Sequence, residues 1–322
     1  MGWIHAGAAT LAGGLLFLTA AGAQEEGLRF DWPQSCRVTV TERSEKKGAT
    51  SQVRYEVVLE RACEPEFLEV RFENFQFQRV NGMDVSSPEA QKALGPAAQL
   101  AAAIPTFLIS RGGRFEDALG IEEMVDKTIA FLKTQEGAGM DEARWKSTEA
   151  MMKSPQMLAQ LKSKVADYWN VWVGGWLGLQ IAAGEQAEAT TNVPMPDGSL
   201  VEAPLRFSHE GAVEGNEGLV RLTAVALLEG PEATRALERS VRKMAEGAGG
   251  AEPPPEPMFE NFRRITTVTV ETDPATLRPA HTMQETLIEL TSATGEVRKQ
   301  REVREHTFDW PTATTGTGTG GK

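Results

Sequence analysis

The sequence predicts an α+β fold, in which one large, curved antiparallel sheet forms an open half-barrel wrapped around central helices. Three observations support this prediction. Segments in which apolar and polar residues alternate, as in half-buried strands, flank a middle region with helical periodicity. The apolar positions change parity near Asn74, which is expected where a bulge bends a strand. Residues 166–183 contain three tryptophans at helical spacing and predict a mostly buried helix.

The first two predicted strands form a hairpin that carries both cysteines of the chain. They flank a turn at residues 45–48, and their apolar residues share one face. If Val38 faces Arg61, then Cys36 faces Cys63 on that same apolar face. Directly opposed Cβ atoms lie about 4.5–5.5 Å apart, close to the reach of a disulfide. We therefore expect a Cys36–Cys63 disulfide, with two buried free thiols as the alternative.

The other predicted elements follow in order along the chain. Residues 66–80 predict a third strand, and Ser87-Pro88 predicts the start of a helix that Gly95-Pro96 interrupts, because Ser caps helices and Pro fits their first turn. Helical periodicity predicts three more helices, at residues 121–134, 141–153 and 154–179. A short charged helix is expected at 230–246, a hairpin at 106–119, and strands at 185–193, 200–209, 218–229, 264–272, 280–290 and 297–306. The last strand carries charge on both faces, so we expect it at a sheet edge.

The beginning of the chain has the pattern of an export signal. Residues 1–23 contain no Lys, Arg, Asp or Glu, and an apolar run is followed by the small residues Ala21 and Ala23. That run is too short to span a bilayer core of roughly 30 Å. We therefore expect cleavage near Ala23 and a soluble protein that is periplasmic or secreted, with an uncleaved N-terminal anchor as the alternative. No later segment is long and apolar enough to span a membrane.

Residues 24–311 predict a single α+β domain, with a Pro/Gly-rich loop at 247–257 and a disordered Gly/Thr-rich tail at 312–322. The sequence Phe-Asp-Trp-Pro occurs near both ends of this domain, at residues 30–33 and 308–311. We interpret the repeat as structural, which predicts that the first and last segments of the domain meet.

Composition and motifs argue against several kinds of chemistry. The formal net charge of −12 disfavours nucleic acid as a partner. The four histidines are isolated, and no metal-binding spacing, nucleophile elbow or phosphate-binding glycine loop occurs. We therefore expect no metal, no cofactor and no enzymatic activity. The two cysteines lack the close CxxC spacing of redox pairs, which indicates a structural role.

The tryptophan segment is the strongest candidate for a binding site. Trp169, Trp172 and Trp176 fall at i, i+3 and i+7, on one face of the predicted helix. Met152 and Met157 lie nearby, and flexible thioethers suit either an irregular core or an adaptable apolar pocket. One interpretation is a central core helix packed inside the sheet. In the other, these five residues form the wall of a cavity for a hydrophobic ligand.

The order of elements resembles the bacterial lipoprotein-carrier fold and related lipid-binding envelope lipoproteins. The hairpin with Cys36 and Cys63, the central helices and the closing strands around residues 273–279 carry this resemblance. It is a resemblance of pattern, so no functional residue can be carried over. With the Trp and Met content, it implies an exported, non-enzymatic binding or carrier protein for a lipid or acyl ligand in the bacterial envelope. Two alternatives are a structural or protein-interaction module of the envelope with a solid core and no ligand, and a hydrolase without a recognisable linear motif.

Overall fold

The computed structural model describes residues 16–17, 27–101, 104–136, 141–247 and 257–311. The strands are β1 (Leu16–Phe17), β2 (Cys36–Lys46), β3 (Ala49–Arg61), β4 (Phe67–Val80), β5 (Met83–Asp84), β6 (Thr106–Ser110), β7 (Phe115–Leu119), β8 (Gln186–Pro194), β9 (Leu200–Val213), β10 (Asn216–Glu229), β11 (Phe259–Thr272), β12 (Pro279–Ser292) and β13 (Val297–Asp309). The helices are α1 (Pro88–Ala101), α2 (Ile121–Glu136), α3 (Glu142–Met152), α4 (Pro155–Trp172), the 3-10 turn η1 (Gly174–Trp176) and α5 (Gly230–Gly247).

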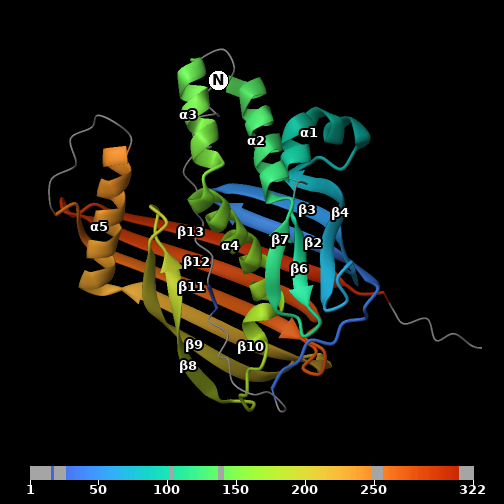
Figure 1. Ribbon diagram of the computed structural model, residues 1–322. Coiled ribbons are helices and arrows are strands. Elements are labelled where there is room, and N and C mark those ends of the chain that lie inside the picture. Colours follow the sequence, from blue (N-terminus) through green and yellow to red (C-terminus); the bar gives the residue numbers. More distant parts are fainter. Residues whose placement is uncertain (1–15, 18–26, 102–103, 137–140, 248–256, 312–322) are drawn as a thin grey trace, which may run out of the picture.

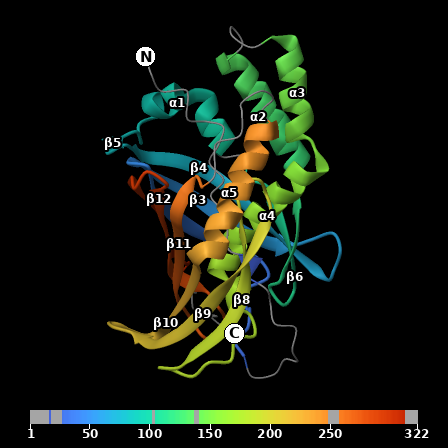
Figure 2. The same cartoon turned by 90° about the vertical axis from the view of Figure 1, so that its left-hand side faces the viewer.

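All strands belong to one open antiparallel sheet. Its order is β1-β8-β9-β10-β11-β12-β13-β2-β3-β4-β6-β7, with β5 paired to β4. Figures 1 and 2 show the sheet curving around α4, while α2 and α3 project from the same side. The predicted class, α+β with a large antiparallel sheet around central helices, is confirmed. The main apolar core lies between α4 and the sheet, and a smaller one lies beneath α5.

The register of the first hairpin differs from the prediction and separates the two cysteines. Lys47 and Gly48 both have positive φ, 50° and 78°, as a two-residue hairpin turn requires. This turn lies within the expected residues 45–48, but pairing Val38 with Arg61 would require a turn centred two residues later, so Cys36 pairs with Leu59 rather than with Cys63. Cys63 lies beyond the end of β3, and both thiols are free. The predicted disulfide is therefore wrong, although the even shift keeps the apolar residues on their expected face.

The change of parity in β4 is a bulge, as predicted. The pairing register between β3 and β4 shifts at Tyr55, because both Asn74 and Phe75 lie opposite this one residue of β3. Asn74 takes the extra position with a left-handed φ of 57°. Phe75 thereby shares a side with Tyr55, and their rings stack with centroids 5.0 Å apart. The bulge bends β4 and adds an aromatic pair to the inner face.

The predictions for two of the helices have different outcomes. In α1 the interruption is confirmed, since Gly95 has the non-helical angles φ 55° and ψ −138°. Helix α4 begins as predicted after Ser154, whose side chain accepts a hydrogen bond from the Met157 amide. It ends at Trp172 instead of continuing to residue 179, because the glycine-rich segment after it forms a 3-10 turn. Trp176 therefore lies on η1 and not on the helix.

Strand β13 lies in the interior of the sheet, between β12 and β2, so the predicted edge position is wrong. Its charges are accommodated because neighbouring strands supply partners of opposite sign on both faces. On the outer face Arg301 pairs with Glu285. On the inner face Glu302 pairs with Lys46 at 3.1 Å. A charged strand can thus be central when its neighbours are matched to it.

The two Phe-Asp-Trp-Pro segments meet, as predicted. The rings of Trp32 and Trp310 pack edge to face, with centroids 4.8 Å apart. Both indoles donate to backbone carbonyls near the start of β12, Trp32 to Leu277 at 3.0 Å and Trp310 to Pro279 at 2.7 Å. The repeat joins the start of the described domain to its last strand.

The terminal predictions lie mostly outside the described residues. This applies to the signal peptide at 1–23, except for Leu16 and Phe17, whose backbone pairs with β8. It also applies to the tail at 312–322 and to most of the loop at 247–257. In the part of the chain that the structure describes, no helix has the length and hydrophobicity to cross a membrane.

Candidate functional site

The three tryptophans predicted as a cavity wall lie together in the main core. Trp169, Trp172 and Trp176 are each 0% exposed. Their rings contact other aromatic rings, namely Phe30 and Trp32 around Trp169, Phe72 and Phe308 around Trp172, and Phe207 beside Trp176. These side chains fill the space beside the helix, which is the arrangement of a central core helix.

The two methionines predicted for the same wall lie elsewhere. Met152 ends α3, and Met157 lies in the first turn of α4. Both are half-buried. Among the described side chains, the apolar cluster that contains the tryptophans includes neither methionine. The structure therefore brings together three of the five predicted residues.

A polar cluster is sealed into the core beside Trp172. Thr282 Oγ1 lies 3.0 Å from His306 Nδ1, and His306 Nε2 lies 3.6 Å from Glu42 Oε2. The Tyr55 hydroxyl donates to the same Glu42 oxygen at 3.4 Å. A hydroxyl, an imidazole and a carboxylate in this order occur in hydrolases. Here Thr282 is 0% and His306 1% exposed, so no substrate can reach the hydroxyl.

The electrostatics of this cluster fit a structural role. Burial alone would raise the pKa of Glu42, but His306, Arg304 and Tyr55 outweigh it and lower this pKa to about 2. Burial also lowers the pKa of His306, although Glu42 acts in the opposite direction. Glu42 is therefore a carboxylate at neutral pH, held among polar partners within an aromatic core.

A cleft of about 340 Å³ opens next to this cluster, between α4 and the sheet. This size falls in the lower range of small-molecule sites. Helix α4 forms one wall, and strands β2, β12 and β13 form the other. Most lining side chains are polar or charged, chiefly Lys46, Lys164, Asp167, Tyr168, Glu302 and Arg304. We call this the α4 cleft.

Asp167 is the most unusual residue of the α4 cleft. It is only 9% exposed, and its Oδ1 atom is buried without a hydrogen-bond partner among the described residues. Burial raises the pKa of Asp167 well above its ordinary value, although the charges of Arg264, Arg304 and Lys164 act in the opposite direction. A carboxyl group in this state can be neutral and donate a hydrogen bond.

The cations of the α4 cleft differ in how they are held. Arg304 lies over the ring of Tyr168, 4.5 Å from its centroid, and its Nε atom is 3.4 Å from Glu42 Oε1. Lys164 is half-buried on α4, and burial together with the charge of Lys46 lowers its pKa. Burial also raises the pKa of Tyr168 to about 12, so its hydroxyl stays protonated. The cleft therefore offers hydrogen-bond donors from both walls.

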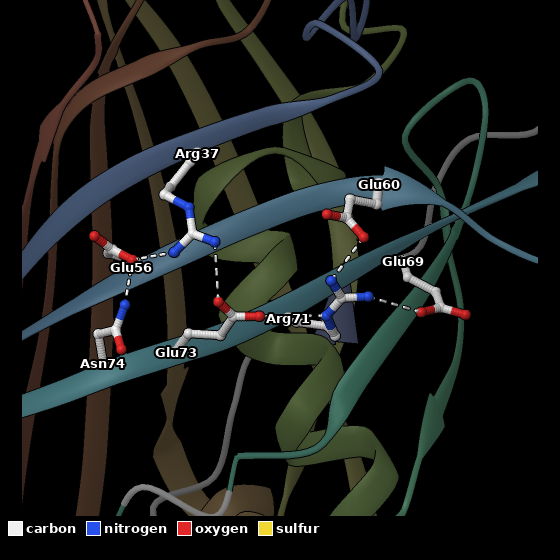
Figure 3. A network of polar contacts seen from close by, with 7 residues as sticks. All are labelled: Arg37, Glu56, Glu60, Glu69, Arg71, Glu73 and Asn74. Carbon is white, nitrogen blue, oxygen red and sulfur yellow. Dashed lines mark hydrogen bonds and ion pairs between the residues drawn. The ribbon is translucent and has the colours of Figure 1, made fainter.

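A second polar group lies on the outer face of the sheet, and Figure 3 shows how its side chains alternate in charge across β2, β3 and β4. Arg71 contacts three carboxylates, those of Glu60 at 2.7 Å, Glu69 at 3.4 Å and Glu73 at 3.5 Å. Arg37 joins Glu73, at 3.1 Å, to Glu56. Each guanidinium is already surrounded by partners, so this network ties strands together and leaves no free group for a ligand.

Sequence reasoning missed Lys164, Asp167 and Arg304. One signal for Asp167 was available, because it is the lone acid of the tryptophan-rich segment at residues 166–183. Arg304 shares strand parity with His306 and Phe308, which face the core. Charged residues at positions that face the core were therefore the sequence signal that could have predicted the α4 cleft.

The structure and the comparisons with known proteins leave the site without a family assignment. Among the described residues, no three His, Cys, Asp or Glu side chains are grouped so that they could hold a metal ion. No protein-family model matches this chain, and no curated protein matches it. The resemblance to the bacterial lipoprotein-carrier fold stays a prediction.

Proposed function

We propose that this protein is a non-enzymatic binding protein that holds a small polar ligand in the α4 cleft. The observation that carries the proposal is the buried Oδ1 atom of Asp167, which lacks a hydrogen-bond partner among the described residues. Leaving such a group unsatisfied costs about 1–3 kcal/mol, and the few that native structures keep each need an explanation. Asp167 also lines the α4 cleft, where a ligand can supply a hydrogen-bond partner. A ligand with a polar atom at this position would remove that cost.

The polar and charged side chains that line the cleft also bear on the hydrophobic ligand expected from the sequence. A lipid or acyl chain beside Trp169 and Trp172 would have to displace aromatic rings that fill the core. The α4 cleft needs no such rearrangement. We therefore favour a polar ligand, and a hydrophobic carrier remains the earlier prediction.

The proposal of a non-enzymatic role rests on the sealed polar cluster. Thr282 and His306 are the described residues that come nearest to a hydrolase arrangement, and both are buried. A protein-interaction module with a solid core is the second candidate, which the fully buried tryptophans favour. It differs from our proposal in requiring no small ligand.

We further propose that the chain is exported and meets its ligand in the periplasm or outside the cell. The uncharged, apolar segment at residues 1–23 supports this. The finer description of the sheet as an open half-barrel belongs to the same proposal, with the concave side filled by α4 and its tryptophans.

Thermal unfolding in the presence of a compound panel tests the proposed site. The panel contains amino acids, sugars, nucleosides, carboxylates, sulfate, phosphate and a fatty acid. A ligand that binds the folded state raises Tm, by an amount that grows with its concentration relative to Kd. We expect a polar compound to raise the Tm of the wild type but not of Gln284→Trp, which fills the cleft.

The matched control is Glu285→Trp. Residue 285 is next along β12, and its side chain pairs with Arg301 on the outer face. This variant should respond as the wild type does. A response to the fatty acid alone, unaffected by Gln284→Trp, would overturn the polar site and support the hydrophobic carrier. No response to any compound would favour the interaction module.

A further inference from the structure

The charges of the α4 cleft are unevenly compensated. Glu302 already pairs with Lys46 at 3.1 Å, and Glu42 lies behind Arg304 at 3.4 Å. Lys164, in contrast, has no carboxylate within 4.0 Å among the described residues, although it is half-buried. Lys164 therefore brings a positive charge without a paired carboxylate into the cleft that it lines together with Arg304 and Asp167.

We propose that the α4 cleft binds an oxyanion, such as a carboxylate, sulfate or phosphate group, between Lys164 and Arg304, with protonated Asp167 donating a hydrogen bond to it. This inference rests on the proposed function and specifies its ligand class. A charged acceptor suits all three groups, because hydrogen bonds to an anion are roughly twice as strong as neutral ones. It also gives a hydrogen-bond partner to the Asp167 carboxyl, whose Oδ1 atom lacks one among the described residues.

The proposal predicts that the anion binds the protonated form of Asp167, so that above the pKa of free Asp167 each anion binds together with one proton. A bound anion disfavours a second negative charge on Asp167, so the complex holds the proton more tightly than the free protein does. The charged and titratable groups that face Asp167 are Lys164 and Tyr168 from α4, Glu45 and Lys46 from β2, Arg264 from β11, and Glu302 and Arg304 from β13. As pH rises through the pKa of free Asp167, Kd should increase by up to about tenfold per pH unit.

Binding of sodium sulfate and sodium succinate between pH 6.5 and 9 tests this inference, because sulfate is fully charged and succinate almost fully charged throughout. Titration calorimetry or NMR at constant ionic strength supplies Kd. For the wild type we expect the affinity to fall as pH rises. Asp167→Asn should bind with little dependence on pH, because the amide donates a similar hydrogen bond without titrating.

The lysine variants test the charge requirement separately. Lys164→Gln should weaken binding at least tenfold, while Lys164→Arg should retain it. Lys162→Gln is the matched control, because Lys162 lies on the same helix but pairs with Asp117 at 2.7 Å outside the cleft. Circular dichroism checks that each variant is folded.

Each outcome separates this inference from the proposed function. If a neutral compound binds in the cleft and neither anion does, the oxyanion inference is wrong and the binding function survives. If Asp167→Asn keeps the wild-type pH dependence, the coupling to Asp167 is wrong. Equal affinity of Lys164→Gln and the wild type would contradict the role of Lys164.

Discussion

At the scale of single residues, the protein stabilises one buried carboxylate and leaves another without hydrogen-bonding support. Glu42 is surrounded by Tyr55, His306 and Arg304, which lower its pKa to about 2. Asp167, which is also buried, has no partner for Oδ1 among the described residues. Burial therefore dominates at Asp167 and raises its pKa well above the ordinary value. Two acids near the same arginine thus have opposite protonation behaviour.

Replacing Asp167 with Asn should stabilise the protein at high pH. The unfolded chain ionises this carboxyl near pH 4, whereas burial raises the pKa of Asp167 in the folded state. Between these two pKa values the folded state binds more protons, so wild-type stability falls as pH rises, by up to about 1.4 kcal/mol per pH unit. The stability of the Asn variant does not fall in this way, because the amide does not ionise. Urea unfolding at pH 5 and pH 8 measures the difference.

The exposed Asp309 supplies the control for this measurement. Asp309→Asn should change stability little, and equally at both pH values. A gain in Asp167→Asn that is no larger at pH 8 than at pH 5 would show that Asp167 is ionised in the folded protein.

At the scale of elements, features that belong to one segment were predicted correctly, whereas the pairing between segments was not. The change of parity at Asn74 and the Gly95-Pro96 interruption are properties of one segment, and both were predicted correctly. The hairpin register depended on where the turn lies, and the position of β13 depended on charges of neighbouring strands. A single strand does not reveal its partners, so these two predictions failed.

The bulge in β4 should require a residue that tolerates a left-handed backbone. Asn74→Val is expected to lower the free energy of unfolding by about 1–2 kcal/mol relative to Asn74→Gly. The reason is that the backbone of any residue with a Cβ atom is strained at a φ of 57°, whereas that of glycine is not. Both variants lose the hydrogen bond from Asn74 to Glu56, so their difference isolates the backbone. Chemical denaturation measures it. Equal stability of the two would mean that the bulge relaxes.

The contact between the two Phe-Asp-Trp-Pro segments should be measurable as a coupling energy. A double-mutant cycle with Trp32→Ala and Trp310→Ala is expected to give about 0.5–1.5 kcal/mol, the range for aromatic pairs. A cycle with Trp32→Ala and Trp145→Ala on α3 serves as the comparison and should give a value near zero. Similar values in both cycles would contradict a specific pairing of the repeats.

At the scale of the whole molecule, the sheet and its central helix were predictable because hydrophobic periodicity decides them. The candidate site was not predictable in the same way. The α4 cleft combines residues from α4 and three strands, and its shape depends on how far α4 lies from the sheet. The tryptophan pattern predicted the correct core but suggested a cavity where aromatic rings fill the space.

Export should leave a defined N-terminus. Protein purified from its natural host is expected to begin at Gln24, as measured by intact-mass and peptide mass spectrometry, because the peptidase pattern ends at Ala23. A mature protein that still carries residues 1–23 would support an uncleaved anchor instead.

A crystal structure of protein purified from its natural host tests the central claim most directly. We predict a bound molecule in the α4 cleft, with a polar atom within hydrogen-bonding distance of Asp167 Oδ1 and of Lys164 Nζ. A lipid or acyl chain between the rings of Trp169 and Trp172, or a cleft closed by side chains, would contradict the claim.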